Sequence, residues 1–129
     1  PLVASTRHLI NADRLATMKP GATMLNTSRG VLIDTPAVID ALVGGRLGRL
    51  GLDVYENEAC FFYDDHSGRP LTDPTLVRLL ALPNVLLTGH QGFLTHEALT
   101  NIAGTTFQSI NDFAAGRPCV HALRTAPAP

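Results

Sequence analysis

The sequence predicts an α/β fold built on a parallel sheet, with a long C-terminal helix. Three short apolar runs, over residues 22–26, 48–54 and 84–88, each end in a polar turn, which is typical of buried strands. The runs lack the alternation of a half-exposed antiparallel strand, as expected for a sheet covered on both faces. Helical patterns separate the runs, so we expect parallel strands joined by right-handed crossovers.

The first two helices have recognisable ends. Asn11 is suited to cap a helix over residues 12–18, which the Pro20–Gly21 pair follows. Thr35 is expected to cap a second helix, with Pro36 at its first helical position and two glycines at its end. This helix and the strands on either side of it form a strand–helix–strand unit.

Residues 56–72 form an irregular insert that contains three aromatic residues: Phe61, Phe62 and Tyr63. The insert is long for a plain loop, which is consistent with a functional or interface role. The alternative, favoured because buried aromatic residues mostly serve packing, is a surface excursion whose aromatic side chains anchor it to the body.

Asp73 and Pro74 open a third helix that ends before Pro83. A long helix follows at about 95–115, and Gly116 and Pro118 end it. Its predicted apolar face consists of Leu99, Ile102, Ala103, Phe107, Ile110 and Phe113. The tail over residues 117–129 has little to bury and is expected to be disordered.

Composition narrows the class of protein. The chain has 129 residues and a net charge of −1, which argues against a dedicated nucleic-acid surface. No apolar run approaches the roughly 18 residues of a membrane span. Cys60 and Cys119 match no metal or redox spacing and are expected to be reduced thiols in a cytoplasmic protein. The five histidines suggest no metal site, and because the chain lacks an initiator methionine, it can be a piece of a longer protein.

The strand ends deliver chemically useful side chains to one edge of the sheet. Arg29 follows the first strand, and its guanidinium can grip a carboxylate through two parallel hydrogen bonds. His90 follows the third strand and is suited to pass a proton near neutral pH. Either Glu58 or Glu56 can pair with His90, and spacing alone does not choose between them. Asp53 ends the second strand, where it can bind a ligand amide or ribose or serve as a turn residue.

This set of residues suits chemistry on a 2-oxo or 2-hydroxy acid. Reduction of such an acid needs a hydride, which no side chain supplies, so a nicotinamide cofactor is implied. A G-x-G-x-x-G loop with an acidic residue downstream is absent from the sequence.

Three stretches carry a family resemblance: MKPGATMLNTSRGVLIDTPAVIDAL, GRLGLDVYENEACFFYDDHSGRPLTD and LPNVLLTGHQGFLTHEALTNIA. The chain resembles the C-terminal part of the D-isomer-specific 2-hydroxyacid dehydrogenases, and the insert points to their D-lactate dehydrogenase branch. The resemblance implies a partial Rossmann-type sheet, the second half of an NAD-binding domain. It implies such a domain over residues 1–93, a return helix toward the missing substrate lobe over 94–116, and a tail over 117–129.

The resemblance also implies roles for individual residues. Arg29 would bind the substrate carboxylate, His90 would protonate the substrate oxygen, and Glu58 would be the acid paired with His90. Phe93 would lie near the substrate methyl group, and Asp53 would contact the nicotinamide side of NAD. The remaining residues implied to line the NAD cleft are Pro1, Thr6, Thr27, Ser28 and the main chain of Arg29.

The expected activity is reduction of pyruvate to the D-2-hydroxy acid by a full-length protein, which the family suggests is a homodimer. One alternative is a dehydrogenase for another 2-hydroxy acid, of the hydroxypyruvate or glyoxylate type. Another is a non-catalytic, NAD-sensing interaction module or an incomplete gene product. Because the glycine-rich loop and the N-terminal lobe are missing, the chain alone is expected to bind NADH weakly or not at all and to expose apolar surface.

Overall fold

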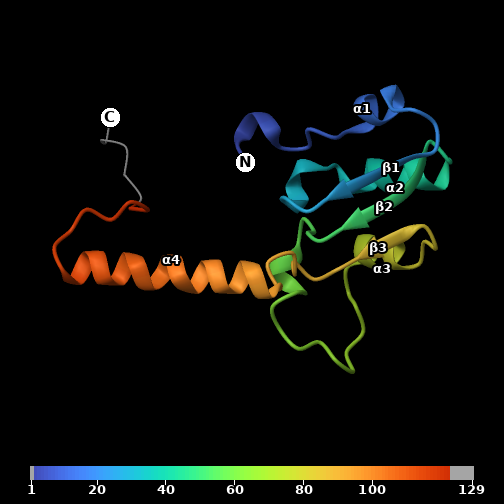
Figure 1. Cartoon of the computed structure of the whole chain (residues 1–129). Helices are drawn as coiled ribbons and strands as arrows, with labels where there is room; N and C mark the ends of the chain where they lie inside the picture. The colour runs from blue at the N-terminus through green and yellow to red at the C-terminus, as the bar shows by residue number, and fades with distance from the viewer. Residues whose placement is uncertain (1, 123–129) are drawn as a thin grey trace. The chain divides into compact units, whose positions relative to one another are not determined.

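A computed structural model describes residues 2–122 of the chain (Figure 1). The described residues fall into two compact units, which divide between Gly92 and Phe93. The first unit holds most of the elements, and the second is built on one long helix. In chain order the elements are η1 (Ala4–Thr6), α1 (Ala12–Thr17), β1 (Ala22–Asn26), η2 (Gly30–Leu32), α2 (Thr35–Val43), β2 (Leu47–Leu52), η3 (Glu58–Cys60), α3 (Pro74–Leu80), β3 (Val85–Leu87) and α4 (His96–Ala114). No helix within residues 2–122 is long and apolar enough to cross a membrane.

The three strands form one sheet in the order β1-β2-β3, and both pairs are parallel. Leu25 of β1 lies opposite Gly51 of β2, which in turn lies opposite Leu86 of β3. The predicted parallel α/β fold is therefore confirmed. Because all three strands run the same way, their carboxyl ends and the turns that follow lie at one edge of the sheet.

Helices α2 and α3 supply the core on one face of the sheet. Val38 and Leu79 are fully buried there, in contact with the buried side chains of β2. The buried core cluster consists of Leu15, Ile33, Val38, Ile39, Leu42, Leu47, Leu50, Leu52, Tyr55, Leu76 and Leu79. This packing fixes the sheet from which the functional loops project.

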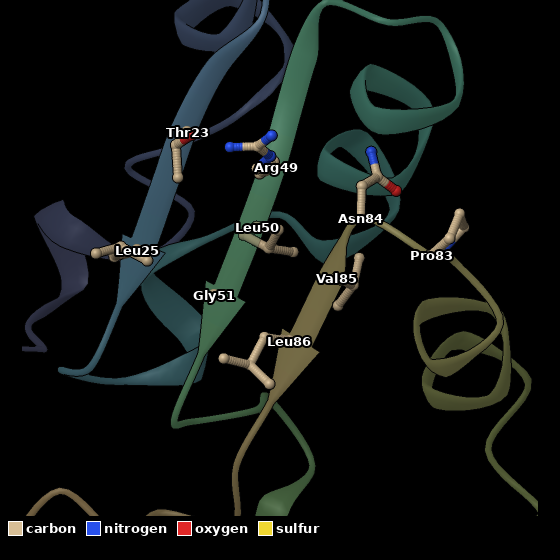
Figure 2. A pocket seen from close by; sticks show the side chains of 9 residues that line it. All are labelled: Thr23, Leu25, Arg49, Leu50, Gly51, Pro83, Asn84, Val85 and Leu86. Carbon is tan, nitrogen blue, oxygen red and sulfur yellow. The ribbon is translucent and has the colours of Figure 1, made fainter.

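The other face of the sheet is open in the described residues (Figure 2). Leu25 is 74% exposed and Leu86 is 68% exposed, and both flank Gly51. A hollow of about 370 Å³ lies on this face, between the strands and the Pro83–Asn84 turn. The expectation of a sheet covered on both faces is therefore wrong for these residues, whereas the expected exposed apolar surface is present.

Two further details differ from the expectations. Asp34, not Thr35, caps α2: its carboxylate accepts a hydrogen bond from the backbone N–H of Ala37 at 3.2 Å. Thr35 is instead the first helical residue, and its hydroxyl is buried without a hydrogen-bond partner among the described residues. Strand β2 ends at Leu52, before the expected limit of 54, although the backbone of the next residue, Asp53, still bonds to Asn26 and His90.

Helix α4 lies within one residue of its predicted bounds, and Thr95 caps it. Its predicted apolar face is exposed in the second unit, from 43% at Leu99 to 82% at Phe113. Residues 117–122 of the predicted tail are described, and residues 123–129 lie outside the described part of the chain.

Candidate active site

The turn after β1 presents Arg29 at the carboxyl edge of the sheet. The buried side chain of Asn26 shapes this turn, since its amide donates to the Arg29 carbonyl at 2.9 Å and its oxygen accepts from the Ser28 N–H at 3.1 Å. Thr27, Ser28 and Arg29 are consequently exposed to solvent. Among the described residues, the Arg29 guanidinium donates a hydrogen bond to the Ser28 carbonyl at 2.7 Å, which leaves most of its five N–H donors for a carboxylate.

Gly30 brings the turn after β1 against the segment after β2. A Cβ atom at this position would lie 2.1 Å from the backbone carbon of Tyr55, which no side chain tolerates. The close approach of these two backbones explains why a glycine must follow Arg29. It also joins the arginine turn to the segment that carries the acidic residues.

Glu58 holds the imidazole of His90 in one orientation. Its Oε1 lies 3.0 Å from His90 Nδ1, and its Oε2 accepts from the Tyr55 backbone N–H at 3.1 Å. Both side chains are mostly withdrawn from solvent, with 18% of Glu58 and 28% of His90 exposed. With Nδ1 engaged, Nε2 is the nitrogen left to meet a ligand.

The turn that carries His90 is anchored by Asp53. His90 has a positive φ of 52°, and its N–H donates to the Asp53 carbonyl at 2.7 Å. The buried Asp53 carboxylate accepts a short hydrogen bond from the Thr88 hydroxyl. It also accepts one hydrogen bond each from the backbone N–H groups of Gln91 and Gly92, both at 2.8 Å. The pKa of Asp53 lies below its ordinary value, chiefly because of the hydrogen bond from Thr88. The hydrogen bonds from the two backbone N–H groups lower this pKa further.

A small hollow of about 140 Å³ lies at the carboxyl ends of the three strands, lined by Leu25, Thr27, Gly51, Leu52, Asp53, Leu86 and Thr88. Two of the residues expected to meet NAD, Thr27 and Asp53, therefore border the same space. An ionised carboxylate can accept about four hydrogen bonds, and Asp53 uses three. The fourth acceptor position suits a donor such as the amide of a nicotinamide, so the residues present fit that cofactor.

The other candidate residues are placed differently. Glu56, the competing partner for His90, pairs with His8 instead, at 2.7 Å between Oε1 and Nε2. Thr6 lies in η1 and exchanges hydrogen bonds with the backbone of Val3. Pro1 lies outside the described residues. Phe93, whose side chain is 51% exposed, begins the second unit, which is described by itself.

Sequence reasoning missed one member of the site. The Tyr63 hydroxyl lies 3.3 Å from Glu58 Oε1 and 3.3 Å from His90 Nδ1. Withdrawal of the hydroxyl from water and then the negative charge of Glu58 raise the pKa of Tyr63, and the positive charge of Arg29 lowers it. Phe61 and Phe62 pack against the core, as expected of anchoring aromatic residues, but Tyr63 is 62% exposed.

Known proteins resemble this chain in sequence and in structure. The NAD binding domain of the D-isomer specific 2-hydroxyacid dehydrogenases matches residues 1–92. The 2-hydroxyacid dehydrogenase A of Aspergillus oryzae is 52% identical over 123 residues, which cover 95% of this chain and 35% of that protein. The D-lactate dehydrogenase of Escherichia coli is 46% identical over 123 residues, which cover 95% of this chain and 37% of that protein.

The structure of the pyruvate reductase of Chlamydomonas reinhardtii is similar, with a TM-score of 0.86 and 46% identity over 94% of this chain and 38% of that chain. The chain therefore spans little more than a third of the length of these relatives.

Proposed function

This chain belongs to the D-isomer specific 2-hydroxyacid dehydrogenase family, and from that premise we propose that it carries the carboxylate-binding and proton-transferring residues of an NAD-dependent enzyme that reduces pyruvate to the D-2-hydroxy acid. The observation that carries the proposal is the His90–Glu58 pair at the carboxyl edge of the sheet, 3.0 Å between Nδ1 and Oε1. The reaction belongs to a protein that also supplies a glycine-rich loop and a substrate lobe.

Each side chain has one task in this mechanism. Arg29 binds the substrate carboxylate through its planar pair of donors, which orients the adjacent keto group. His90, protonated and stabilised by Glu58, gives its Nε2 proton to the keto oxygen as that oxygen gains negative charge. Glu58 stays ionised and keeps the imidazole oriented. When bound, NADH supplies the hydride that reduces the keto carbon.

Asp53 and Thr27 would hold the nicotinamide end of the cofactor, because both line the hollow at the strand ends. The backbone of Ser28 and Arg29 lies in the adjoining turn. Asp53 therefore has two tasks in the proposal: it anchors the turn that carries His90, and it offers its remaining acceptor position to the cofactor amide.

Pyruvate is favoured over a phosphorylated acid. The name of the Chlamydomonas reinhardtii relative, a pyruvate reductase, supports a small unphosphorylated substrate. The cationic side chain that acts on the Tyr63 hydroxyl, beside His90 and Glu58, is Arg29, whose task in the proposal is to bind the substrate carboxylate. The proposal also places the reaction in the cytoplasm, where Cys60 and Cys119, both free thiols in the structure, would stay reduced.

A chimera tests this function. The 123 aligned residues of the Escherichia coli D-lactate dehydrogenase are replaced by those of this chain, and NADH oxidation by pyruvate is followed. We expect turnover that His90→Gln lowers at least about 100-fold, the usual size of a general acid's contribution. His121→Gln, an exposed histidine of the second unit, is the matched control and should keep full activity.

Near-normal turnover by the His90→Gln chimera would rule out the mechanism. Parallel rates with pyruvate, hydroxypyruvate and glyoxylate separate the favoured substrate from the alternatives. NADH binding without turnover of any of the three would instead indicate a non-catalytic NAD-sensing module.

A further inference from the structure

We propose that Tyr63 is a positioning residue that holds the Glu58 carboxylate against His90 through a hydrogen bond from its hydroxyl. This inference rests on the proposed function, because it concerns proton transfer at the same site. It assigns a role to a residue of the insert that lies at none of the three strand ends and to which the family resemblance assigns none.

The three polar groups form a closed triangle. Glu58 Oε1 lies 3.0 Å from His90 Nδ1 and 3.3 Å from the Tyr63 hydroxyl, and that hydroxyl lies 3.3 Å from Nδ1. The second carboxylate oxygen, Oε2, is held at 3.1 Å by the Tyr55 backbone N–H. A backbone N–H thus holds one oxygen of the Glu58 carboxylate, and the side chains of His90 and Tyr63 contact the other.

The protons of this triangle have one consistent arrangement. An ionised carboxylate only accepts, so Oε1 receives both the Nδ1–H of His90 and the O–H of Tyr63. The Tyr63 proton therefore stays on its oxygen, and His90 keeps Nε2 for the substrate. Two donors on one oxygen restrict the carboxylate more than one donor does.

Packing does not account for the position of Tyr63. Tyr63 is 62% exposed, whereas Phe61 and Phe62 are partly buried against the core. Removal of the hydroxyl alone should therefore leave the fold of the insert intact. Three titratable or charged groups contact the hydroxyl or act on it, namely Glu58, His90 and Arg29.

The first experiment follows the ionisation of Tyr63 in this chain by NMR, with the ring carbon next to the hydroxyl labelled. The chain has two tyrosines, so the Tyr63→Phe variant assigns the signal. Glu58 is one of the causes that raise the pKa of Tyr63, so Glu58→Gln should lower the ionisation midpoint of that residue toward its ordinary value. Glu56→Gln, whose partner is His8, is the matched control and should leave the midpoint unchanged.

The second experiment measures kinetics in the chimera described above. Tyr63→Phe should lower kcat about fivefold, the worth of one ordinary hydrogen bond, with the KM for pyruvate unchanged. In a Glu58→Gln background the same change should have no further effect, because Tyr63 acts through Glu58.

The inference is overturned if Glu58→Gln leaves the ionisation midpoint of Tyr63 unchanged. It is also overturned if Tyr63→Phe lowers kcat by the same factor in the Glu58→Gln background as in the parent chimera. A Tyr63 midpoint that moves in this chain while the chimera is inactive would support the Tyr63–Glu58 bond and contradict the dehydrogenase function. The two proposals therefore fail separately.

Discussion

Glu58 and His90 are 32 residues apart in the chain, yet Oε1 and Nδ1 lie 3.0 Å apart at the carboxyl edge of the sheet. Parallel pairing of β2 with β3 places the two turns side by side, and hydrogen bonds from the Tyr55 and Gly92 backbones fix the segments on which they lie. The contact between these two side chains thus follows from the topology of the sheet.

Glu58→Gln and Glu56→Gln form a matched test of that pair. Both remove a carboxylate that lies near a histidine, but only Glu58 contacts His90. We expect Glu58→Gln to lower kcat of the chimera about 100-fold and Glu56→Gln to lower it less than about threefold. Equal losses in steady-state assays would show that the identity of the paired acid does not matter.

Arg29→Lys should act on substrate binding. An ammonium group is a point charge that cannot form the two parallel bonds of a guanidinium with a carboxylate. We expect the KM for pyruvate to rise about tenfold or more, which corresponds to the loss of one charged hydrogen bond. Arg14→Lys, at an exposed position of α1, controls for the change of residue type. An unchanged KM in Arg29→Lys would exclude a carboxylate clamp.

Asp53 should make the stability of the first unit depend on pH. The pKa of the Asp53 carboxyl is lowered in the folded chain, first by the hydrogen bond from Thr88. The ionised carboxylate therefore stabilises the fold fully above the unfolded pKa of 3.8, and this stabilisation is lost as the pH falls through the lower folded pKa. Asp53→Asn should cost about 2 kcal/mol at pH 7, because backbone N–H groups lose a charged acceptor. Urea unfolding at pH 7 and at lower pH checks this. The difference in the free energy of unfolding between the parent chain and Asp53→Asn must decrease below about pH 4.

Gly30→Ala should separate the arginine turn from the acidic segment. The added methyl would lie 2.1 Å from the Tyr55 backbone carbon, so one of the two backbones must move. We expect a loss of about 2 kcal/mol in the free energy of unfolding, the range of overpacked sites. Gly104→Ala, in α4 with open space around it, is the control and should stabilise the chain or leave it unchanged; equal effects would refute the close-approach argument.

Much of this site could be predicted from residue order, because parallel strands carry the residues after them to one edge. The positions of Arg29, Asp53 and His90 at this edge follow from that rule. Spacing could not decide between Glu58 and Glu56, because the two lie in an irregular segment where spacing does not tell which side chain turns toward which loop; the family resemblance indicated Glu58. Asp34 and Thr35 are both good capping residues and adjacent, so the cap of α2 depended on where the chain enters the helix.

Tyr63 lay beyond sequence reasoning for a similar reason. It belongs to an insert without periodicity, next to two phenylalanines that do pack against the core, and its hydroxyl reaches His90 only through the path of that loop. The His8–Glu56 pair, 48 residues apart, was missed in the same way. Contacts made by irregular segments depend on the whole fold and not on a local pattern.

The most direct test is a crystal structure of the chimera with NAD and oxamate, an unreactive analogue of pyruvate. The proposal predicts that the Arg29 guanidinium makes two hydrogen bonds to the oxamate carboxylate and that His90 Nε2 lies about 3 Å from its carbonyl oxygen, with Nδ1 still on Glu58. Oxamate bound with its carbonyl oxygen away from Nε2, or held by a cation other than Arg29, would contradict it.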